Sequence, residues 1–376
     1  MEKFSAYRDP GTGIQPFLPP VPPSENDLFV TLLMPVRGVL AMVRTALVAA
    51  IAFIHVLLHA LYEFFIPIPS LRCRIGGGST MLLSRLALYV LGFIWIPEEV
   101  VTRKRGQGPA VKWNPKAGDI IVSNWVSWTD VLWLAYRFNP IFIIPVSDNS
   151  FSSVPSPDGA SLSMAYRPGR RARVGSDAVF TSNRPIGTRE AIQGFRRVSL
   201  LSIIRATGKT PRMAPVGSVA PFETIRQSAE RPIVVFPECT TSNGRGLLRF
   251  VNVFEDVTVP VKRFNVFVMC IRYGPPTSLQ PSLAHPVPSL TMNPLRHLFT
   301  ITTSMFPQAM SIRMLAPSES PSSQLFMANE VVTETSVDLL SEACAVLIAK
   351  IGKMKRVGFG WEDKTAFLSF YWGQRM

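Results

Sequence analysis

A long uncharged apolar run near the N-terminus constrains this 376-residue chain more than any other feature. Residues 45–62 carry no formal charge, and the apolar stretch continues to Ile66 with only Glu63 interrupting it. A helix needs about 20 such residues to cross the hydrocarbon core of a bilayer. The run therefore predicts a membrane helix. A helix buried inside a soluble protein is the alternative interpretation.

The flanks of this run bear on its topology. Residues 86–96 form a second apolar run that is too short to span a bilayer, and it predicts a re-entrant or interfacial helix packed beside the first. Acidic side chains outnumber basic ones in residues 1–30, whereas basic ones dominate after the first run. This asymmetry places the rest of the chain in the cytosol. Prolines at 35, 67 and 69 keep open a hairpin that only dips into the membrane.

The charge and the cysteines limit the classes of partner and site. The formal net charge of +14 predicts an anionic partner. Nucleic acid is the weaker choice, because the sequence holds no zinc-finger spacing or RNA-binding signature. The four cysteines include no CxxC pair, which argues against a disulfide framework and against a metal site, and fits a reducing compartment.

The chain divides into four parts. Residues 1–27 are a proline-rich leader, expected to be an extended linker, with an SH3-type ligand as the alternative. Residues 28–97 are the membrane-anchoring part, 98–330 an α/β domain, and 331–376 a C-terminal helix with an aromatic tail. Residues 147–185, rich at first in Ser, Pro, Gly and Arg, are predicted to be a disordered insertion, with an anionic-lipid or phosphate contact as the alternative.

The α/β pattern begins at about residue 98. Strands are expected at residues 119–123, 141–145, 232–236 and 266–273. The third of these is apolar enough to be buried on both faces, as in a parallel sheet. Helices are expected at residues 128–138, 188–199, 294–305 and 335–352.

Two polar loops, each directly after an apolar strand, carry the candidate chemistry. They cover residues 123–130 and 236–245. Ligands of open α/β sheets bind beyond the carboxyl ends of the strands, so we expect the loops to meet around one pocket for an anionic headgroup. Hydroxyls and amides at 240–242, with Arg245, would make a phosphate cradle. Each loop also has a purely structural interpretation, as a capping box with Ser127 and Asp130 and as an Asn-Gly turn.

Together the loops resemble motifs of the glycerophospholipid acyltransferase family. Its first motif, N-H-x-S-x-x-D, is matched by Asn124, Ser127 and Asp130, and its third, F-P-E-G-T, by Phe236, Pro237, Glu238 and Thr240. Residues 201–205 occupy the place of a second motif that ends in arginine, and residues 266–273 that of a fourth-motif strand. The opening, Met1 to Pro19, is similar to a fungal lysophosphatidic acid acyltransferase subgroup. The resemblance covers nearly the whole chain except 147–176.

The resemblance implies an α/β fold with a mixed sheet flanked by helices, preceded by an N-terminal membrane helix or hairpin. It implies acyl transfer to lysophosphatidic acid from acyl-CoA, a co-substrate rather than a tightly bound cofactor. The implied location is the endoplasmic reticulum or lipid droplet surface, with the catalytic domain in the cytosol. The implied catalytic positions are Asn124, Trp125, Ser127 and Asp130. The implied substrate-binding positions are Arg205, Glu238, Thr240, Thr241, Ser242, Asn243 and Arg245.

Two positions depart from the family pattern. The motif histidine is Trp125, whose indole has no basic nitrogen at neutral pH, and the motif glycine is Cys239. No other histidine is an obvious substitute in the sequence: residues 55 and 59 lie in the first apolar run, and residues 285 and 297 in an irregular region. We hypothesise that Asp130 acts as the base, its pKa raised towards neutrality by crowding from nearby tryptophans.

Three functional alternatives follow from these departures. The protein acylates lysophosphatidic acid, or it acylates another lysophospholipid, or it retains the fold only to bind or traffic lipid. An acyl-enzyme on the Cys239 thiol is a further alternative for the mechanism.

Overall fold

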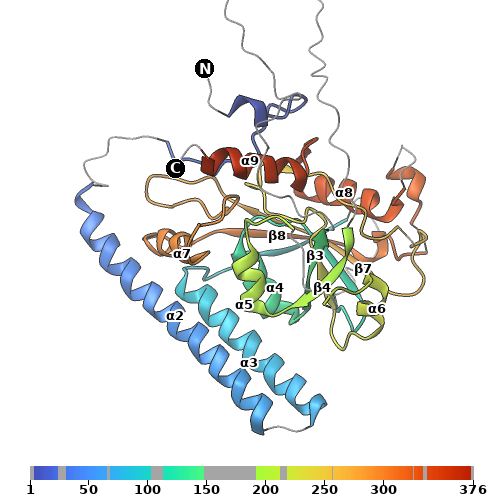
Figure 1. The fold of residues 1–376 in the computed structure, drawn as a ribbon, viewed down its shortest axis with the longest axis horizontal. Coiled ribbons are helices and arrows are strands. Elements are labelled where there is room, and N and C mark those ends of the chain that lie inside the picture. The colour runs from blue at the N-terminus through green and yellow to red at the C-terminus, as the bar shows by residue number, and fades with distance from the viewer. Residues whose placement is uncertain are drawn as a thin grey trace, which may run out of the picture.

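A computed structural model of the chain describes residues 4–23, 31–65, 68–102, 113–147, 192–211, 218–255, 257–324, 326–332 and 337–373. At its centre lies a mixed seven-stranded sheet with the order β1-β8-β7-β2-β5-β3-β4 (Figure 1). The mixed sheet confirms the predicted α/β fold class. The predicted insertion lies outside the described residues except for Ser147, which ends a strand.

The strands of this sheet pair in both directions. They are β1 (Glu98–Val101), β2 (Ile120–Ser123), β3 (Ile141–Ser147), β4 (Ile192–Val198), β5 (Ile233–Val235), β7 (Val266–Tyr273) and β8 (Met310–Leu315). The central strand β2 is parallel to both β5 and β7, whereas β3–β4 and β7–β8 are antiparallel. A small second sheet joins β6 (Gly246–Leu247) to β9 (Lys355–Arg356). All four predicted strands are confirmed.

The helices include most of those predicted. They are α2 (Met34–Phe65), α3 (Pro69–Val90), α4 (Trp128–Phe138), α5 (Leu200–Ala206), α6 (Phe222–Gln227), α7 (Leu295–Thr302), α8 (Leu339–Gly352) and α9 (Trp361–Gly373), with short 3-10 turns at Ser5–Tyr7, Pro317–Glu319 and Ala328–Glu330. The helix predicted at 188–199 is wrong, because residues 192–198 form β4. The spacing of Ile192, Phe195 and Val198 imitates a helical period, but pairing with β3 at the sheet edge decides the conformation.

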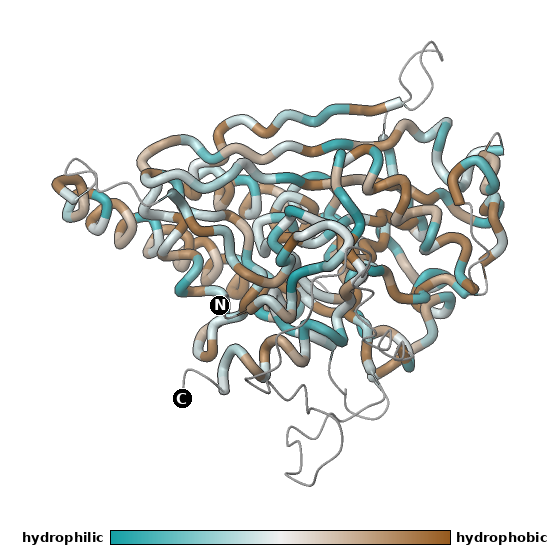
Figure 2. Tube along the Cα trace, turned by 90° about the horizontal axis from the view of Figure 1, so that it is seen from above, coloured by the Kyte–Doolittle hydropathy of each residue, from teal (hydrophilic) through white to brown (hydrophobic). Residues whose placement is uncertain are grey.

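The sheet is buried on both faces, as its apolar central strands predict. Ile120 and Val122 of β2 belong to a core that includes α8, whereas Ile121 belongs to a second core with α4. Successive strand residues point to opposite faces, so one strand feeds both cores. Figure 2 shows apolar residues inside the domain and also on helices at its edge.

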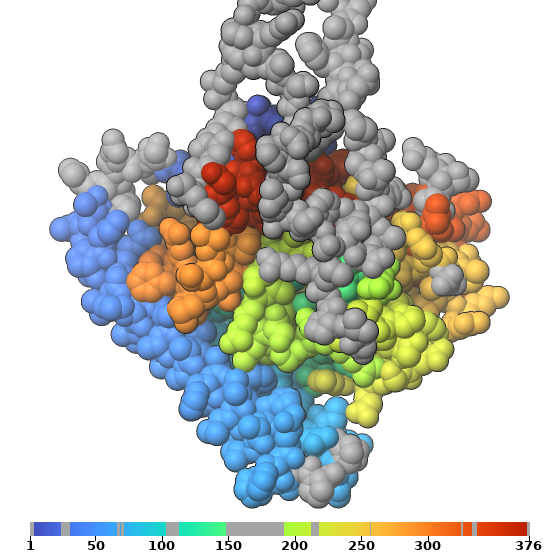
Figure 3. Space-filling model, viewed as in Figure 1, coloured from blue at the N-terminus to red at the C-terminus, as the bar shows by residue number. Residues whose placement is uncertain are grey.

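The N-terminal helices form a hairpin that leans against one side of the domain (Figures 1 and 3). Among the described residues, α2 is the one helix long and apolar enough to cross a membrane. The short helix predicted at 86–96 is instead the last part of α3, which ends where Gly92 adopts a φ of 98°. Hydrogen bonds from Arg44 to the Ser304 carbonyl (2.6 Å) and between Thr45 and Thr302 (3.0 Å) fix α2 beside α7.

The described part of the leader, residues 4–23, packs on the domain, so its prediction as an extended linker is wrong. Phe17 is buried between Phe359 and Phe367, and the Asp9 carboxylate accepts a hydrogen bond from the Gly358 amide (3.0 Å). The leader lies over α9 in Figure 1. The described leader therefore packs on the same domain that follows the α2–α3 hairpin.

Candidate functional site

The two motif loops meet, as predicted, at the carboxyl ends of β2 and β5. The Trp125 amide donates to Oε2 of Glu238 (2.7 Å), and the Ser242 amide donates to the Trp125 carbonyl (3.1 Å). The indole of Trp125 stacks on Phe236 with ring centroids 4.8 Å apart. Parallel pairing of adjacent strands brings both loops to the same sheet edge.

In the first motif the side chains of Asn124, Ser127 and Asp130 all make hydrogen bonds within the protein. Ser127 and Asp130 form the predicted capping box of α4, and Oδ2 of Asp130 accepts the amides of Val126 and Ser127 at 2.8 Å each. The Tyr273 hydroxyl donates to the other carboxylate oxygen. Asn124 exchanges two hydrogen bonds with the backbone of Ile271, at 2.8 and 2.9 Å, which attaches the loop to β7.

Asp130 has the raised pKa that the sequence predicted, but not the exposure of a base. Burial raises its pKa to about 6, against the opposing effect of hydrogen bonds from Tyr273 and two backbone amides. Its side chain is fully buried, and both oxygens already accept hydrogen bonds. In this geometry Asp130 organises the loop.

Glu238 joins the two loops. Its carboxylate accepts hydrogen bonds from the amides of Trp125 (2.7 Å) and Leu248 (2.9 Å). Burial raises its pKa to about 8. The interpretation of Glu238 as an anchor of the loop agrees with this geometry, since a fully buried carboxyl with two internal partners has little freedom to contact a glycerol hydroxyl.

The predicted phosphate cradle at 240–245 differs from the structure. The hydroxyls of Thr240, Thr241 and Ser242 are buried and donate to the carbonyls of Lys209 (2.9 Å), His285 (2.7 Å) and Gly246 (3.4 Å). The Asn243 amide donates to the Gln15 and Leu18 carbonyls of the leader. These groups are committed to the protein, and Arg245 is exposed and is not among the residues that line the cavity described below.

A buried lysine that the sequence analysis missed completes the second loop. Lys364 of α9 is fully buried and donates from Nζ to Oγ1 of Thr240 (2.7 Å) and to the carbonyl of Thr241 (2.6 Å). Burial lowers its pKa well below the usual value. Nothing in the sequence marked it, because it stands in the aromatic tail far from either motif.

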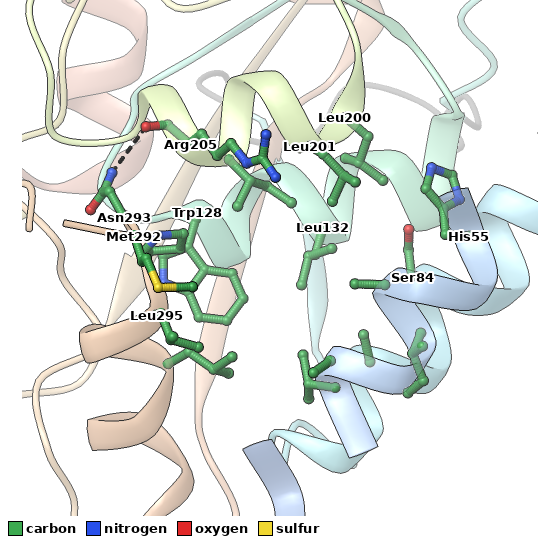
Figure 4. A pocket seen from close by; sticks show the side chains of 18 of the residues that line it. His55, Ser84, Trp128, Leu132, Leu200, Leu201, Arg205, Met292, Asn293 and Leu295 are labelled. Atoms are coloured by element: carbon green, nitrogen blue, oxygen red, sulfur yellow. Dashed lines mark hydrogen bonds between the residues drawn. The ribbon is translucent and has the colours of Figure 1, made fainter. Parts of the chain in front are cut away.

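A largely apolar cavity of about 530 Å³ lies between the α2–α3 hairpin, α4, α5 and the start of α7 (Figure 4). His55 and Ser84 lie on its hairpin side, and Trp128 and Leu132 come from α4. Away from the hairpin lie Arg205 and Asn293 (Figure 4), and Lys209 is a second cationic residue of the lining. Of the site residues predicted from the sequence, the lining includes Arg205.

Two histidines that the sequence placed in an irregular region lie against the first motif. The His285 amide donates to the Val126 carbonyl (2.9 Å), and Nε1 of Trp128 donates to Nδ1 of His297 (2.9 Å). Their rings stack with centroids 4.5 Å apart. His285 lies between β7 and α7, where the residues lack a period, and His297 lies on α7, so only the tertiary structure shows this approach.

The Cys239 thiol is poorly suited to form an acyl-enzyme. Burial raises its pKa well above the usual value, so the thiol stays protonated at neutral pH. Its backbone is left-handed, with a φ of 57°, at the position where the family motif has glycine. Among the described residues, no cluster of three or more His, Cys, Asp or Glu side chains is arranged to bind a metal.

Over nearly its whole length the chain is similar in sequence to a yeast protein. This is a Schizosaccharomyces pombe protein described as "Putative lysophosphatidic acid:oleoyl-CoA acyltransferase", 25% identical over 372 residues, which cover 98% of this chain and 97% of that protein. No protein-family model matches the chain, and no solved structure matches it. The similarity supports an acyltransferase of lipid metabolism in general terms.

Proposed function

We propose that this protein transfers an acyl group from acyl-CoA to the free hydroxyl of lysophosphatidic acid at a membrane surface. The observation that carries the proposal is the cavity, whose largely apolar lining includes two cationic side chains, Arg205 and Lys209, beside the motif loops. An acyl chain matches such walls, and a phosphate monoester matches such cations. The similarity to the S. pombe protein supports the same reaction.

The membrane part of the proposal rests on the hairpin. Large apolar side chains such as Phe53, Phe64 and Phe65 of α2 are exposed, and the same hairpin forms one wall of the cavity. A lipid held in the membrane can therefore keep its chain in apolar surroundings while its headgroup reaches the cationic end. The excess of basic residues after α2 supports a cytosolic domain at the endoplasmic reticulum or a lipid droplet.

A panel of lysolipids tests the substrate. The purified full-length chain in vesicles is mixed with labelled oleoyl-CoA and lysolipids that bear phosphate, choline, ethanolamine or inositol headgroups. We expect labelled phosphatidic acid to form fastest, with stoichiometric release of free CoA. Faster turnover of a choline lysolipid would contradict the proposed acceptor, and turnover of none would contradict the activity.

A non-catalytic lipid-binding protein is the second candidate. It is favoured by Trp125, whose indole nitrogen is buried without a hydrogen-bond partner in the described part of the chain and cannot take a proton. Saturable binding of lysophosphatidic acid without turnover of any lysolipid would support it.

A further inference from the structure

The proposed reaction needs a proton acceptor that neither motif residue provides. The attacking hydroxyl must lose a proton as it joins the thioester carbonyl. Trp125 has no basic nitrogen, and both oxygens of Asp130 are occupied by backbone amides and the Tyr273 hydroxyl. The base must therefore come from outside the motifs.

His285 is the histidine held between the two motif loops. Its amide donates to the Val126 carbonyl of the first loop (2.9 Å), and its carbonyl accepts from the Thr241 hydroxyl of the second (2.7 Å). Lys364 holds Thr241 from the other side, since Nζ donates to the Thr241 carbonyl (2.6 Å). The backbone of His285 is thus fixed within a segment that has no regular secondary structure.

The tautomer of His285 follows from its neighbour Asn293. The Asn293 amide nitrogen donates to the carbonyls of Arg205 (3.1 Å) and Thr207 (2.7 Å), so its Oδ1 must be the atom that faces His285 (Figure 4 shows the Arg205 bond). Oδ1 lies 2.8 Å from Nε2 of His285 and also accepts the Ser289 amide. Nε2 therefore carries the proton, and Nδ1 carries the lone pair.

His285 and Asn293 lie next to the cationic end of the cavity. Asn293 lines the cavity, and its side chain donates to the carbonyl of Arg205, which is the residue proposed to bind the phosphate. Burial lowers the pKa of His285 to about 4, which the Asn293 hydrogen bond opposes and the Lys364 charge reinforces. His297, stacked on the ring from α7, is also neutral, because burial lowers its pKa to about 3. His285 is thus unprotonated at neutral pH.

We propose that His285, oriented by Asn293, is the general base of the acyl transfer; this assignment rests on the proposed function. Nδ1 takes the hydroxyl proton as the C–O bond forms, the C–S bond of the thioester breaks, and the imidazolium returns the proton to the CoA thiolate. An amide that fixes the tautomer of a catalytic imidazole has a precedent in Cys-His-Asn proteases. His285 is 5% exposed and touches the cavity only through its partner Asn293, so the proposal requires a local rearrangement that brings Nδ1 into contact with the substrate.

The first test substitutes the two stacked histidines. We expect His285→Gln to lower kcat about 100-fold or more, with the KM for lysophosphatidic acid nearly unchanged. His297→Gln is the matched control, because both nitrogens of His297 are occupied, by Trp128 and by the Ser282 carbonyl. It should keep kcat within about fivefold of the wild type, since it removes no base. A folded His285→Gln variant with nearly wild-type kcat would overturn the assignment.

The second test moves the pH profile and does not depend on removing His285. Asn293→Asp places a carboxylate beside Nε2, and an adjacent opposite charge raises the pKa of an imidazole by about 1–3 units. We expect the acid limb of kcat/KM, below about pH 5 in the wild type if it follows the His285 pKa of about 4, to move upward by that amount. An unchanged limb in the folded variant would overturn the assignment, even if His285→Gln fails to fold. Wild-type protein that turns over no lysolipid would overturn the proposed function as well.

Discussion

Two polar regions beside the cavity differ in what they leave available for a substrate. The loops at 124–130 and 236–245 carry the recognisable motifs, and their carboxylates and hydroxyls are buried and paired within the protein. The part of the cavity wall formed by Arg205, Lys209 and Asn293 carries no motif beyond a weak match at Arg205, yet it presents two cationic side chains to the cavity.

The difference shows that a sequence motif can consist of residues that hold the loops in place rather than of residues that react. A buried carboxylate that accepts two backbone amides fixes a loop with high precision, because any other arrangement leaves those amides unsatisfied. Asn293 at the cavity wall is also held by hydrogen bonds, but its partners Arg205 and Thr207 are distant in the chain, so its role is harder to recognise from a pattern.

The prediction with the largest expected effect tests whether the motif loops stabilise the fold. Glu238→Ala leaves the buried amides of Trp125 and Leu248 without an acceptor, and each costs about 1–3 kcal/mol, so we expect the free energy of unfolding to fall by roughly 2–6 kcal/mol. Chemical denaturation of the purified protein measures this loss. Glu238→Gln keeps one acceptor and should lose about half as much. Unaltered stability of the alanine variant would show that the two hydrogen bonds accepted by Glu238 are dispensable.

Substituting one arginine in each region compares the two regions directly. Arg205 lines the cavity, whereas Arg245 stands in the motif loop, is exposed and does not line the cavity. A hydrogen bond to a charged group contributes about 1.5–3 kcal/mol, so Arg205→Ala should raise the KM for lysophosphatidic acid about 10- to 100-fold. Arg245→Ala should change it less than twofold. Steady-state kinetics in vesicles decide the matter, and the reverse order would return phosphate binding to the motif loop.

The smallest effect is expected where the chain departs from the motif. Cys239→Gly relieves a left-handed backbone, by about 1–2 kcal/mol, but removes a buried thiol that contributes about 1 kcal/mol, so stability should change by less than about 1 kcal/mol. Turnover should persist, because the thiol is protonated. Cys344→Gly in the helix α8 is the control, and it should lose more than about 1 kcal/mol since glycine weakens a helix. Lost turnover in Cys239→Gly would restore the acyl-enzyme alternative.

The sequence by itself determined the features that repeat along the chain or occupy short segments. Apolar runs predicted β2, β3, β5 and β7, and a capping box predicted the start of α4. The long uncharged run predicted α2, and the order of strands and loops predicted that the two motifs meet. These features are local, or follow from the geometry of parallel strands, and therefore remain readable without coordinates.

Only the tertiary structure decided which side chains are free and which are committed. The hydroxyls at 240–242 looked open in the sequence, but Lys364, more than 120 residues away, and the Lys209 and His285 carbonyls occupy them. The same long-range packing folded the leader onto α9 and brought His285 to the first motif. Hydrogen-bond partners distant in the chain leave no local pattern, so the sequence could name the loops but not the chemistry left available between them.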